Sequence, residues 1–407
     1  MSLVDDLILH VDKIDLPEKK KILFDSFLKT GFPTTNDEEW KYTSLKKIIS
    51  NGYRLDYNSQ NIDKQIVEKY CLGFGNKIVF SEGKMIHSPN IKGVYINDFS
   101  DFECKNADSI AKLNSALANK GFDIHIEDDT VINQPIEILF FSSTENNFSQ
   151  YRNRITIGKN SSVKIIEGIR DLSDSNVFTI NFTQINCAKN SNLEYNKIQN
   201  NQAKASLIDY TNIFQEKDST CNVNTLIFGG NFIRNNLNFE QNGFNCESNM
   251  NGVSILSENQ FADNHTFVDH KVAHCRSNET YKGIYLDSSK GVFNGKIMVR
   301  QDAQKIDAFQ SNNNLLLSEK STIDSKPQLE IYADDVKCSH GCTIGQLDND
   351  ALFYMRSRGI GKDEAEAVLT YAFASEVIES ITIPELKKLA QELLAKKLNV
   401  NIDFSLS

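Results

Sequence analysis

The feature that most constrains this chain is a short turn sequence that returns at a constant interval. The segment IGKNSSV (157–163) recurs thirty positions later as CAKNSNL (187–193), and a weaker echo spans 214–221. A polar Lys-Asn-Ser turn between apolar strand residues at such a period is typical of stacked coils in a β-solenoid. A jelly-roll sandwich also has short strands and turn clusters, but gives no reason to repeat one turn sequence. The repeat therefore favours a solenoid.

The repeat lies inside a long β-rich region flanked by helical patterns. From about residue 77 to 333, short alternating runs of Ile, Val, Phe and Thr are separated by Asn, Ser, Gly and Asp. The 407 residues, 40% of them hydrophobic, exceed one average domain. We predict a mainly β protein with three units: an N-terminal helical domain (1–75), a β core (76–340) and a C-terminal helical domain (341–407).

The N-terminal region combines helical spacing with one distinctive aromatic residue. Pro17 is placed for a helix start, and Ile22, Leu23 and Phe27 recur at helical intervals. Trp40, the chain's only tryptophan, follows within a short EEWKYT segment. We interpret it as a packing anchor because a large aromatic ring buries much apolar area.

Three helices are predicted after Gly345. Asp348 can cap the first, Asp363 with Glu366 forms an acidic capping box for the second, and Pro384 starts the third. The second helix carries apolar residues on more than one face between 368 and 377, which indicates burial on two sides. The second contact is either ordinary packing in this unit or a partner protein.

Charge, apolar runs and cysteine content narrow the location and the partners. A formal net charge of −10 gives no general attraction to nucleic acid or anionic lipid. Asp5 and Asp6 stand where a secretory signal would be basic, and apolar runs such as 138–141 are far shorter than the roughly 20 residues of a spanning helix. Eight thinly spread cysteines are typical of a reducing compartment. We expect a cytoplasmic protein.

One motif at the end of the β region has ligand chemistry. In an extended Cys338-Ser339-His340-Gly341-Cys342 segment, the two thiols and the imidazole share one face at intervals of roughly 6.6–6.8 Å. That spacing is too wide for a closed zinc site on one strand and suits an open site completed by another chain. We predict a functional role for His340 and interpret Cys342 as a buried filler.

A second cluster spans 263–275. It contains Asp263, His265, Asp269, His270, His274 and Cys275. On a strand, His270 and His274 would share a face, with His265 on the other. Such a cluster can bind metal, but polar residues hydrogen-bonded at solenoid turns are the favoured interpretation.

Motifs of common catalytic sites are missing from the sequence. It contains no G-x-x-x-x-G-K-[ST] phosphate loop, no G-x-S-x-G elbow and no H-E-x-x-H helix. We therefore predict that the chain is neither an ATPase nor a hydrolase of these types.

The region around the Cys-Ser-His-Gly motif resembles a known family. The matching segments are KPQLEIYADDVKCSHG (326–341), TIG (343–345) and LFYMRSRGI (352–360), with DNHT (263–266), YKGI (281–284), FNGKI (293–297), 308–317 and EWKYT (39–43). Together they are similar to the signature of the SufB/SufD family of iron–sulfur cluster assembly scaffolds, and the motif and length resemble the SufD branch. The family often has alanine at the position of Cys342.

The resemblance implies a fold, partners and a site. It implies a right-handed parallel β-helix between helical domains, which pairs with a SufB-type paralogue, while the C-terminal helices bind a SufC-type ATPase. The histidine at position 340 would lie at the SufB interface and help build the nascent cluster, with Cys338 as the weaker candidate. Sulfur would arrive on SufB. The isolated chain could also form a homodimer.

Two functional hypotheses follow. The first is a non-enzymatic scaffold subunit that binds no cofactor tightly alone and holds iron or an iron–sulfur cluster transiently, with His340 as a ligand shared with the partner. The alternative is a single-chain metal-dependent enzyme that uses the 263–275 cluster together with His340.

Overall fold

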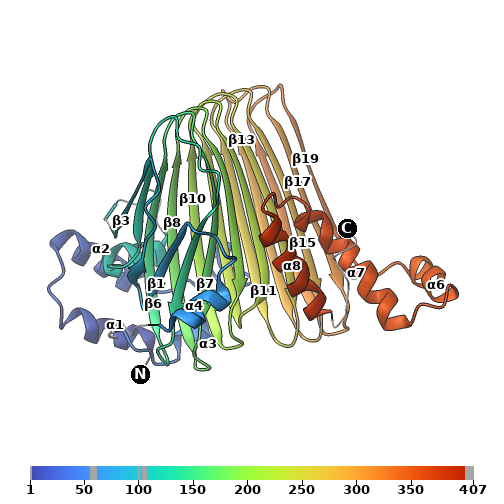
Figure 1. Ribbon diagram of the computed structural model, residues 1–407, viewed down its shortest axis with the longest axis horizontal. Coiled ribbons are helices and arrows are strands. Elements are labelled where there is room, and N and C mark those ends of the chain that lie inside the picture. Colours follow the sequence, from blue (N-terminus) through green and yellow to red (C-terminus); the bar gives the residue numbers. More distant parts are fainter. Residues whose placement is uncertain (1, 56–61, 100, 103–107, 399–407) are drawn as a thin grey trace.

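The computed structural model describes the chain except residues 1, 56–61, 100, 103–107 and 399–407. Two long sheets wind through its centre (Figure 1). The first has the order β19-β17-β15-β13-β11-β9-β7-β5-β1-β2, and the second β18-β16-β14-β12-β10-β8-β6-β4-β3. Successive strands alternate between the sheets, and from β4 and β5 onward each pairs in parallel with the next strand but one. The fold is a parallel β-solenoid, as the repeat predicts.

The strand bounds show how regular the coils are. The strands are β1 (Lys77–Ser81), β2 (Lys84–His87), β3 (Val94–Asp98), β4 (Phe122–Ile126), β5 (Ile136–Ser142), β6 (Phe148–Ile157), β7 (Ser162–Asp171), β8 (Val177–Cys187), β9 (Asn192–Asn200), β10 (Ala205–Gln215), β11 (Thr220–Gly229), β12 (Phe232–Gln241), β13 (Glu247–Leu256), β14 (Phe261–His270), β15 (Arg276–Tyr285), β16 (Lys290–Val299), β17 (Asp307–Leu316), β18 (Thr322–Ile331) and β19 (Lys337–Gly345). The last strand thus continues five residues beyond the predicted domain boundary at 340.

The repeated turn has a conformational cause. Asn160 and Asn190 both have φ 56°, and Asp218 in the weaker echo has φ 61°. Asparagine and aspartate tolerate this left-handed region better than other side chains. The turns also bond to one another, since Asn190 Nδ2 donates to Asn160 Oδ1 at 2.9 Å. The Lys-Asn-Ser sequence recurs because each coil needs the same corner.

The N-terminal helices pack against the solenoid. They are α1 (Leu3–Val11), α2 (Glu18–Thr30), the 3-10 helix η1 (Glu38–Trp40), α3 (Lys46–Ile49) and α4 (Lys64–Tyr70), and α5 (Ser109–Leu117) lies within the predicted β core. Leu7 and Phe27 share one apolar cluster with Phe178 and Tyr210 on the outer face of the second sheet. Trp40 is 4% exposed, and the guanidinium of Arg234 lies 3.7 Å from its ring centroid. The ring is a packing anchor, as interpreted.

Three helices follow Gly345 in the described part of the chain: α6 (Asn349–Ser357), α7 (Lys362–Ile378) and α8 (Pro384–Lys397). Helices α7 and α8 cover the outer face of the first sheet, where Val377 and Leu394 pack against Phe228 and Val253. Helix α6 projects away from the solenoid (Figure 1).

The helix starts agree with the sequence in two of three places. Asp348 caps α6 by accepting from the Asp350 amide at 2.9 Å, and Pro384 begins α8. The capping box predicted for α7 is wrong. That helix begins two residues earlier, at Lys362, with Gly361 at the cap and no side-chain cap hydrogen bond, so Asp363 already lies inside its first turn.

Candidate functional site at the open end of the solenoid

The solenoid ends on two strands that have a neighbour on one side only. Strand β19 pairs with β17, and β18 pairs with β16; in the described residues neither has a second partner strand. All seven residues of β19 from Ser339 to Gly345 are exposed. This end therefore presents two rows of unpaired backbone groups, which in other proteins serve as templates for strand addition.

The register places the motif on the inner face of this end. Cys338 and His340 are the Cα partners of Ala308 and Gln310 on β17, and both β17 residues are buried inside the solenoid. In-register parallel strands point partnered side chains the same way. Cys338, His340 and Cys342 therefore share the face at the mouth of the solenoid interior, as their spacing predicts.

The three side chains differ in their surroundings. His340 is exposed, and Cys338 is half-buried against the apolar cluster that contains Ile297 and Val299. Burial, and next the Asp307 carboxylate, raise the pKa of the Cys338 thiol above its ordinary value. That thiol is therefore held protonated, which weakens it as a metal ligand.

Cys342 is exposed, so its interpretation as a buried filler is wrong. Its Sγ donates to Ser325 Oγ on β18 at 3.2 Å. A residue in the middle of the solenoid is covered by the next coil, but in the described residues no coil follows β19.

The 263–275 cluster is divided between different surroundings. Asp263 and His265 face outward from β14 toward the N-terminal segment: Arg234 Nη1 lies 2.6 Å from Asp263 Oδ2, and His265 Nε2 lies 3.0 Å from Asp263 Oδ1. His265 Nδ1 is also 3.4 Å from Glu39 Oε2. These residues attach the segment around Trp40 to the solenoid.

The rest of the cluster points elsewhere. His270 lies inside the solenoid, where its Nε2 is 3.0 Å from Ser277 Oγ, and burial lowers its pKa to about 4. Asp269 pairs with Arg300 on the outer face. His274 occupies a coil corner with φ 62°, so it does not share a strand face with His270. Across the described ranges, no three His, Cys, Asp or Glu side chains are placed to hold one metal ion.

Sequence reasoning missed two polar residues next to the motif. Glu279 on β15 and Gln310 on β17 are Cα partners, and both are 2% exposed. Gln310 Nε2 donates to Glu279 Oε2 at 2.7 Å, and burial raises the pKa of Glu279 to about 7. Only the strand register reveals that these residues share a column with His340, because they lie 30 and 61 positions before it in the sequence.

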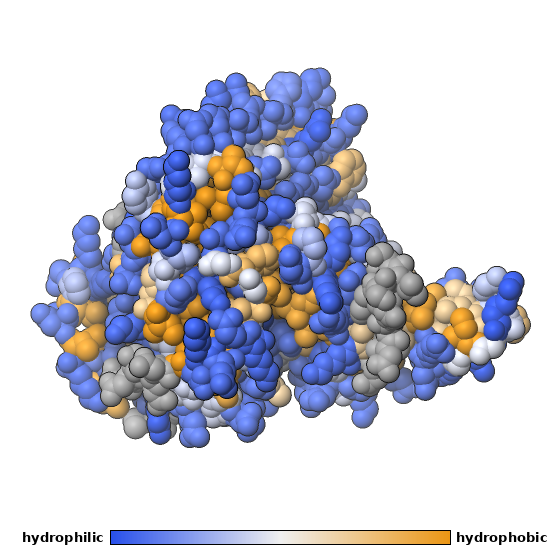
Figure 2. Space-filling model, viewed as in Figure 1, coloured by the Kyte–Doolittle hydropathy of each residue, from blue (hydrophilic) through white to orange (hydrophobic). Residues whose placement is uncertain are grey.

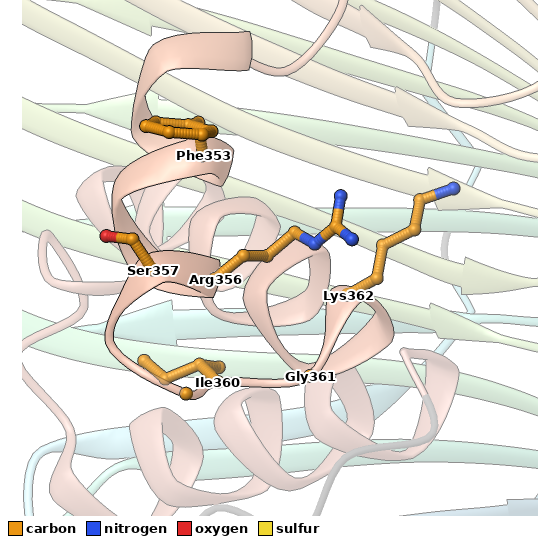
Figure 3. A pocket seen from close by; sticks show the side chains of 7 residues that line it. Phe353, Arg356, Ser357, Ile360, Gly361 and Lys362 are labelled. Atoms are coloured by element: carbon orange, nitrogen blue, oxygen red, sulfur yellow. The ribbon is translucent and has the colours of Figure 1, made fainter.

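A second exposed feature is the corner between α6 and α7. A pocket of about 500 Å³ opens there, lined by Phe353, Arg356, Ser357, Gly359, Ile360, Gly361 and Lys362 (Figure 3). Phe353 is 74% exposed and Tyr354 58% exposed. Figure 2 shows hydrophobic residues on this projecting helix beside hydrophilic ones. The corner combines uncovered aromatic rings with basic groups.

No helix in the part of the chain that the structure describes has the length and apolar character needed to cross a membrane.

Comparison with known proteins agrees with this geometry. The family model "SUF system FeS cluster assembly, SufBD core domain" matches residues 140–373, and "SufBD protein N-terminal region" matches 9–71. The chain is 31% identical to the iron–sulfur cluster assembly protein SufD of Escherichia coli over 91% of this chain and 89% of that protein. It is 27% identical to a SufBD family protein of Synechocystis over 87% of this chain and 85% of that protein. The chain therefore belongs to the SufB/SufD family of the SUF system for iron–sulfur cluster assembly and is of the SufD type.

Proposed function

We propose that this chain is the non-catalytic SufD-like subunit of a cytoplasmic SufB–SufC–SufD complex that assembles iron–sulfur clusters. The observation that carries the proposal is the exposed His340 on the inner face of an unpaired terminal strand. Iron and the nascent cluster are cargo here, held transiently and handed on. A site that one chain leaves incomplete suits this task, because a fully coordinated cluster is harder to release.

The partner at the open end is a SufB-type paralogue. Strands β18 and β19 offer edges to which another chain can add its own strands. Pairing there would cover the exposed residues of β19 and bring the partner's side chains to the mouth of the solenoid. The same edge would serve a homodimer of the isolated chain.

His340 is the residue of this chain that contributes to cluster chemistry. Its imidazole can ligate iron or carry a proton, and the residue is exposed where a partner would bind. It contributes to iron acquisition and to the nascent cluster as a ligand shared with SufB. Cys338 contributes less, since its half-buried thiol has a raised pKa.

A SufC-type ATPase docks on the C-terminal helices. Helices α7 and α8 are committed to the solenoid through Val377 and Leu394. Helix α6 instead leaves Phe353 and Tyr354 uncovered beside Arg356 and Lys362. Exposed aromatic rings next to arginine are frequent among residues that dominate binding energy.

The alternative of a single-chain metal-dependent enzyme has no comparable support. It requires the 263–275 residues and His340 to converge. In the described residues His265 faces the N-terminal segment, His270 is buried beside Ser277, and His340 lies on the other sheet. No observation favours this function.

Replacing His340 by alanine tests the proposal. We expect His340→Ala to leave the three-component complex and its ATPase activity intact, because the residue is exposed and supports no core packing. Cluster formation in cells should be lost, as measured by iron and acid-labile sulfide in the purified complex. Cys342→Ala, on the same strand face, is the control and should assemble clusters normally. Normal assembly by His340→Ala would remove the chemical role.

A further inference from the structure

A column of polar side chains runs from the solenoid interior to its open end. Glu279, Gln310 and His340 occupy successive strands of the first sheet, and each is the Cα partner of the next. All three lie on the inner face. The first two are 2% exposed, whereas His340 is exposed at the edge. Buried polar groups thus lead directly to the histidine proposed to contact the cluster.

The amide of Gln310 is oriented by its neighbour. Its Nε2 donates to Glu279 Oε2 at 2.7 Å, which directs the amide nitrogen toward β15. The amide oxygen diverges from the nitrogen and therefore points away from Glu279. This oxygen is fully buried and has no hydrogen-bond partner among the residues that the structure describes. Buried polar atoms are almost always satisfied, so an unpartnered acceptor in this position requires an explanation.

The opposite sheet makes room for the amide, and the hydroxyl of Thr266 on β14, the other Cα partner of Gly295, lies beside Glu279. A Cβ at Gly295 on β16 would lie 2.2 Å from Gln310 Nε2, so only glycine allows the observed position. Gly295 is the Cα partner of Pro327 on β18. Neither side chain carries a hydrogen-bond donor. In this column the polar side chain beyond Gln310 is the imidazole of His340.

We infer that Gln310 is a positioning residue for His340. When a partner covers the open edge, Gln310 Oε1 accepts the hydrogen of one imidazole N–H, and the lone pair of the other ring nitrogen faces the partner. Glu279 holds the amide in the orientation that makes this possible, and Gly295 provides its space. The inference rests on the proposed function of His340.

The chemistry of metal-bound histidine explains why such a device is useful. A ligating imidazole commonly donates its second N–H to a carbonyl or carboxylate, which fixes the tautomer and the ring orientation. His340 lies on an edge strand that has no neighbouring strand on its outer side in the described part of the chain, so its ring needs an internal support. Loss of such supports lowers metal affinity or activity about 10–100-fold.

The test uses the SufB–SufC–SufD complex with variants of this subunit. Gln310→Met keeps the length of the side chain and removes the acceptor. Gly295→Ala leaves residues 310 and 340 unchanged and displaces the amide. The exchange Glu279→Gln with Gln310→Glu restores a hydrogen-bonded pair with a free oxygen toward His340. Asn312→Leu is the matched control, since Asn312 is also 2% exposed and lies on the same strand face.

The readouts are cluster content and the pulsed EPR signal of the reduced cluster. The ¹⁴N quadrupole coupling of the remote imidazole nitrogen reports whether that nitrogen is hydrogen-bonded. We expect cluster content to fall about tenfold or more in Gln310→Met and Gly295→Ala, with an altered ¹⁴N coupling in the remaining cluster, and to recover in the exchange variant. Asn312→Leu should retain both signals, and all variants should form the complex.

Three outcomes would overturn the inference. The first is wild-type cluster content and ¹⁴N coupling in Gln310→Met, when His340→Ala still abolishes assembly. The second is an equal loss in Asn312→Leu, which would show a general effect on stability. The third is no recovery in the exchange variant when its unfolding midpoint equals that of the wild type. Normal assembly by His340→Ala would instead contradict the proposed function itself.

Discussion

His270 is a histidine that could in principle bind metal but instead packs inside the solenoid as a buried polar residue. Its ring is 0% exposed, its Nε2 lies 3.0 Å from Ser277 Oγ, and burial lowers its pKa to about 4 despite the nearby Asp269 carboxylate. A neutral ring is therefore built into the folded state. The folded chain takes up this proton only near pH 4, well below the pH at which an exposed histidine does.

The lowered pKa of His270 predicts that the free energy of unfolding falls as the pH falls. The unfolded-state pKa of histidine is about 6.5, so between pH 6.5 and pH 4 the unfolded chain binds a proton that the folded chain excludes. This residue's contribution to stability is complete above pH 6.5, and about 3 kcal/mol is lost as the pH falls to 4. Urea unfolding of wild type and His270→Gln at several pH values would measure it.

His270→Gln should lower the free energy of unfolding by about 1–3 kcal/mol at pH 7, since Ser277 loses a buried partner. Its free energy of unfolding should then decline less steeply than that of wild type toward pH 4. His274→Asn is the control, because His274 is exposed at a corner where asparagine tolerates φ 62°. Parallel pH profiles for wild type and His270→Gln would contradict the buried neutral histidine.

At the scale of elements, the sequence predicts those features that depend on interactions between residues close in the chain. The repeated turn was predictable because asparagine adopts the left-handed corner that each coil needs, and α6 because Asp348 accepts from its first turn. The dependence of the N-terminal helices on the solenoid was not. The helical spacing around Phe27 predicts the core of a small domain. Its apolar cluster also includes Tyr210 of the solenoid, and a contact between residues so far apart in the chain produces no periodic pattern in the sequence.

The exposed aromatic residues of helix α6 can be tested for ATPase binding. Phe353→Ala with Tyr354→Ala should leave the unfolding free energy within about 0.5 kcal/mol of wild type, because both rings are mostly exposed. If this helix docks the ATPase, their loss should weaken binding by about 2 kcal/mol or more, which is roughly 30-fold. Titration calorimetry with the purified ATPase measures the change.

Phe244→Ala provides the control for that experiment. Phe244 is 52% exposed at a solenoid corner, remote in sequence from the C-terminal helices. It should bind the ATPase as wild type does. Equal weakening by Phe244→Ala, or none by the α6 variant, would place the docking surface elsewhere.

For the whole molecule, the solenoid explains why the site could be predicted only in part. Spacing alone put Cys338 and His340 on one face, and the register confirms this. The spacing could not show that β19 ends the described sheet, and for this reason the prediction of a buried Cys342 fails. The spacing could not reveal Gln310 either, because residues that are neighbours on adjacent coils lie about thirty positions apart in the sequence.

Only alternate N–H groups of β19 face the open edge, so a substitution can remove one of them without affecting the pairing with β17. The Lys337 amide donates to Ile306 O, immediately before β17. In a parallel ladder alternate residues point their N–H groups to opposite sides, so those of Cys338, His340 and Cys342 face the free edge. A proline at such a position removes a donor for the partner and leaves the ladder to β17 intact. Gly341 before position 342 accommodates the restriction that proline imposes on its predecessor.

Cys342→Pro should therefore separate association from folding. Its thermal midpoint should stay close to that of Cys342→Ala, because no internal backbone hydrogen bond is lost. Association with the SufB-type partner should weaken about tenfold, since the proline ring clashes with an added strand and one hydrogen bond of about 1 kcal/mol is missing. Sedimentation or calorimetric titration of the two variants measures this difference directly. Equal affinities of the proline and alanine variants would show that the partner does not pair with β19, and the mouth of the solenoid would then have to be closed by side chains alone.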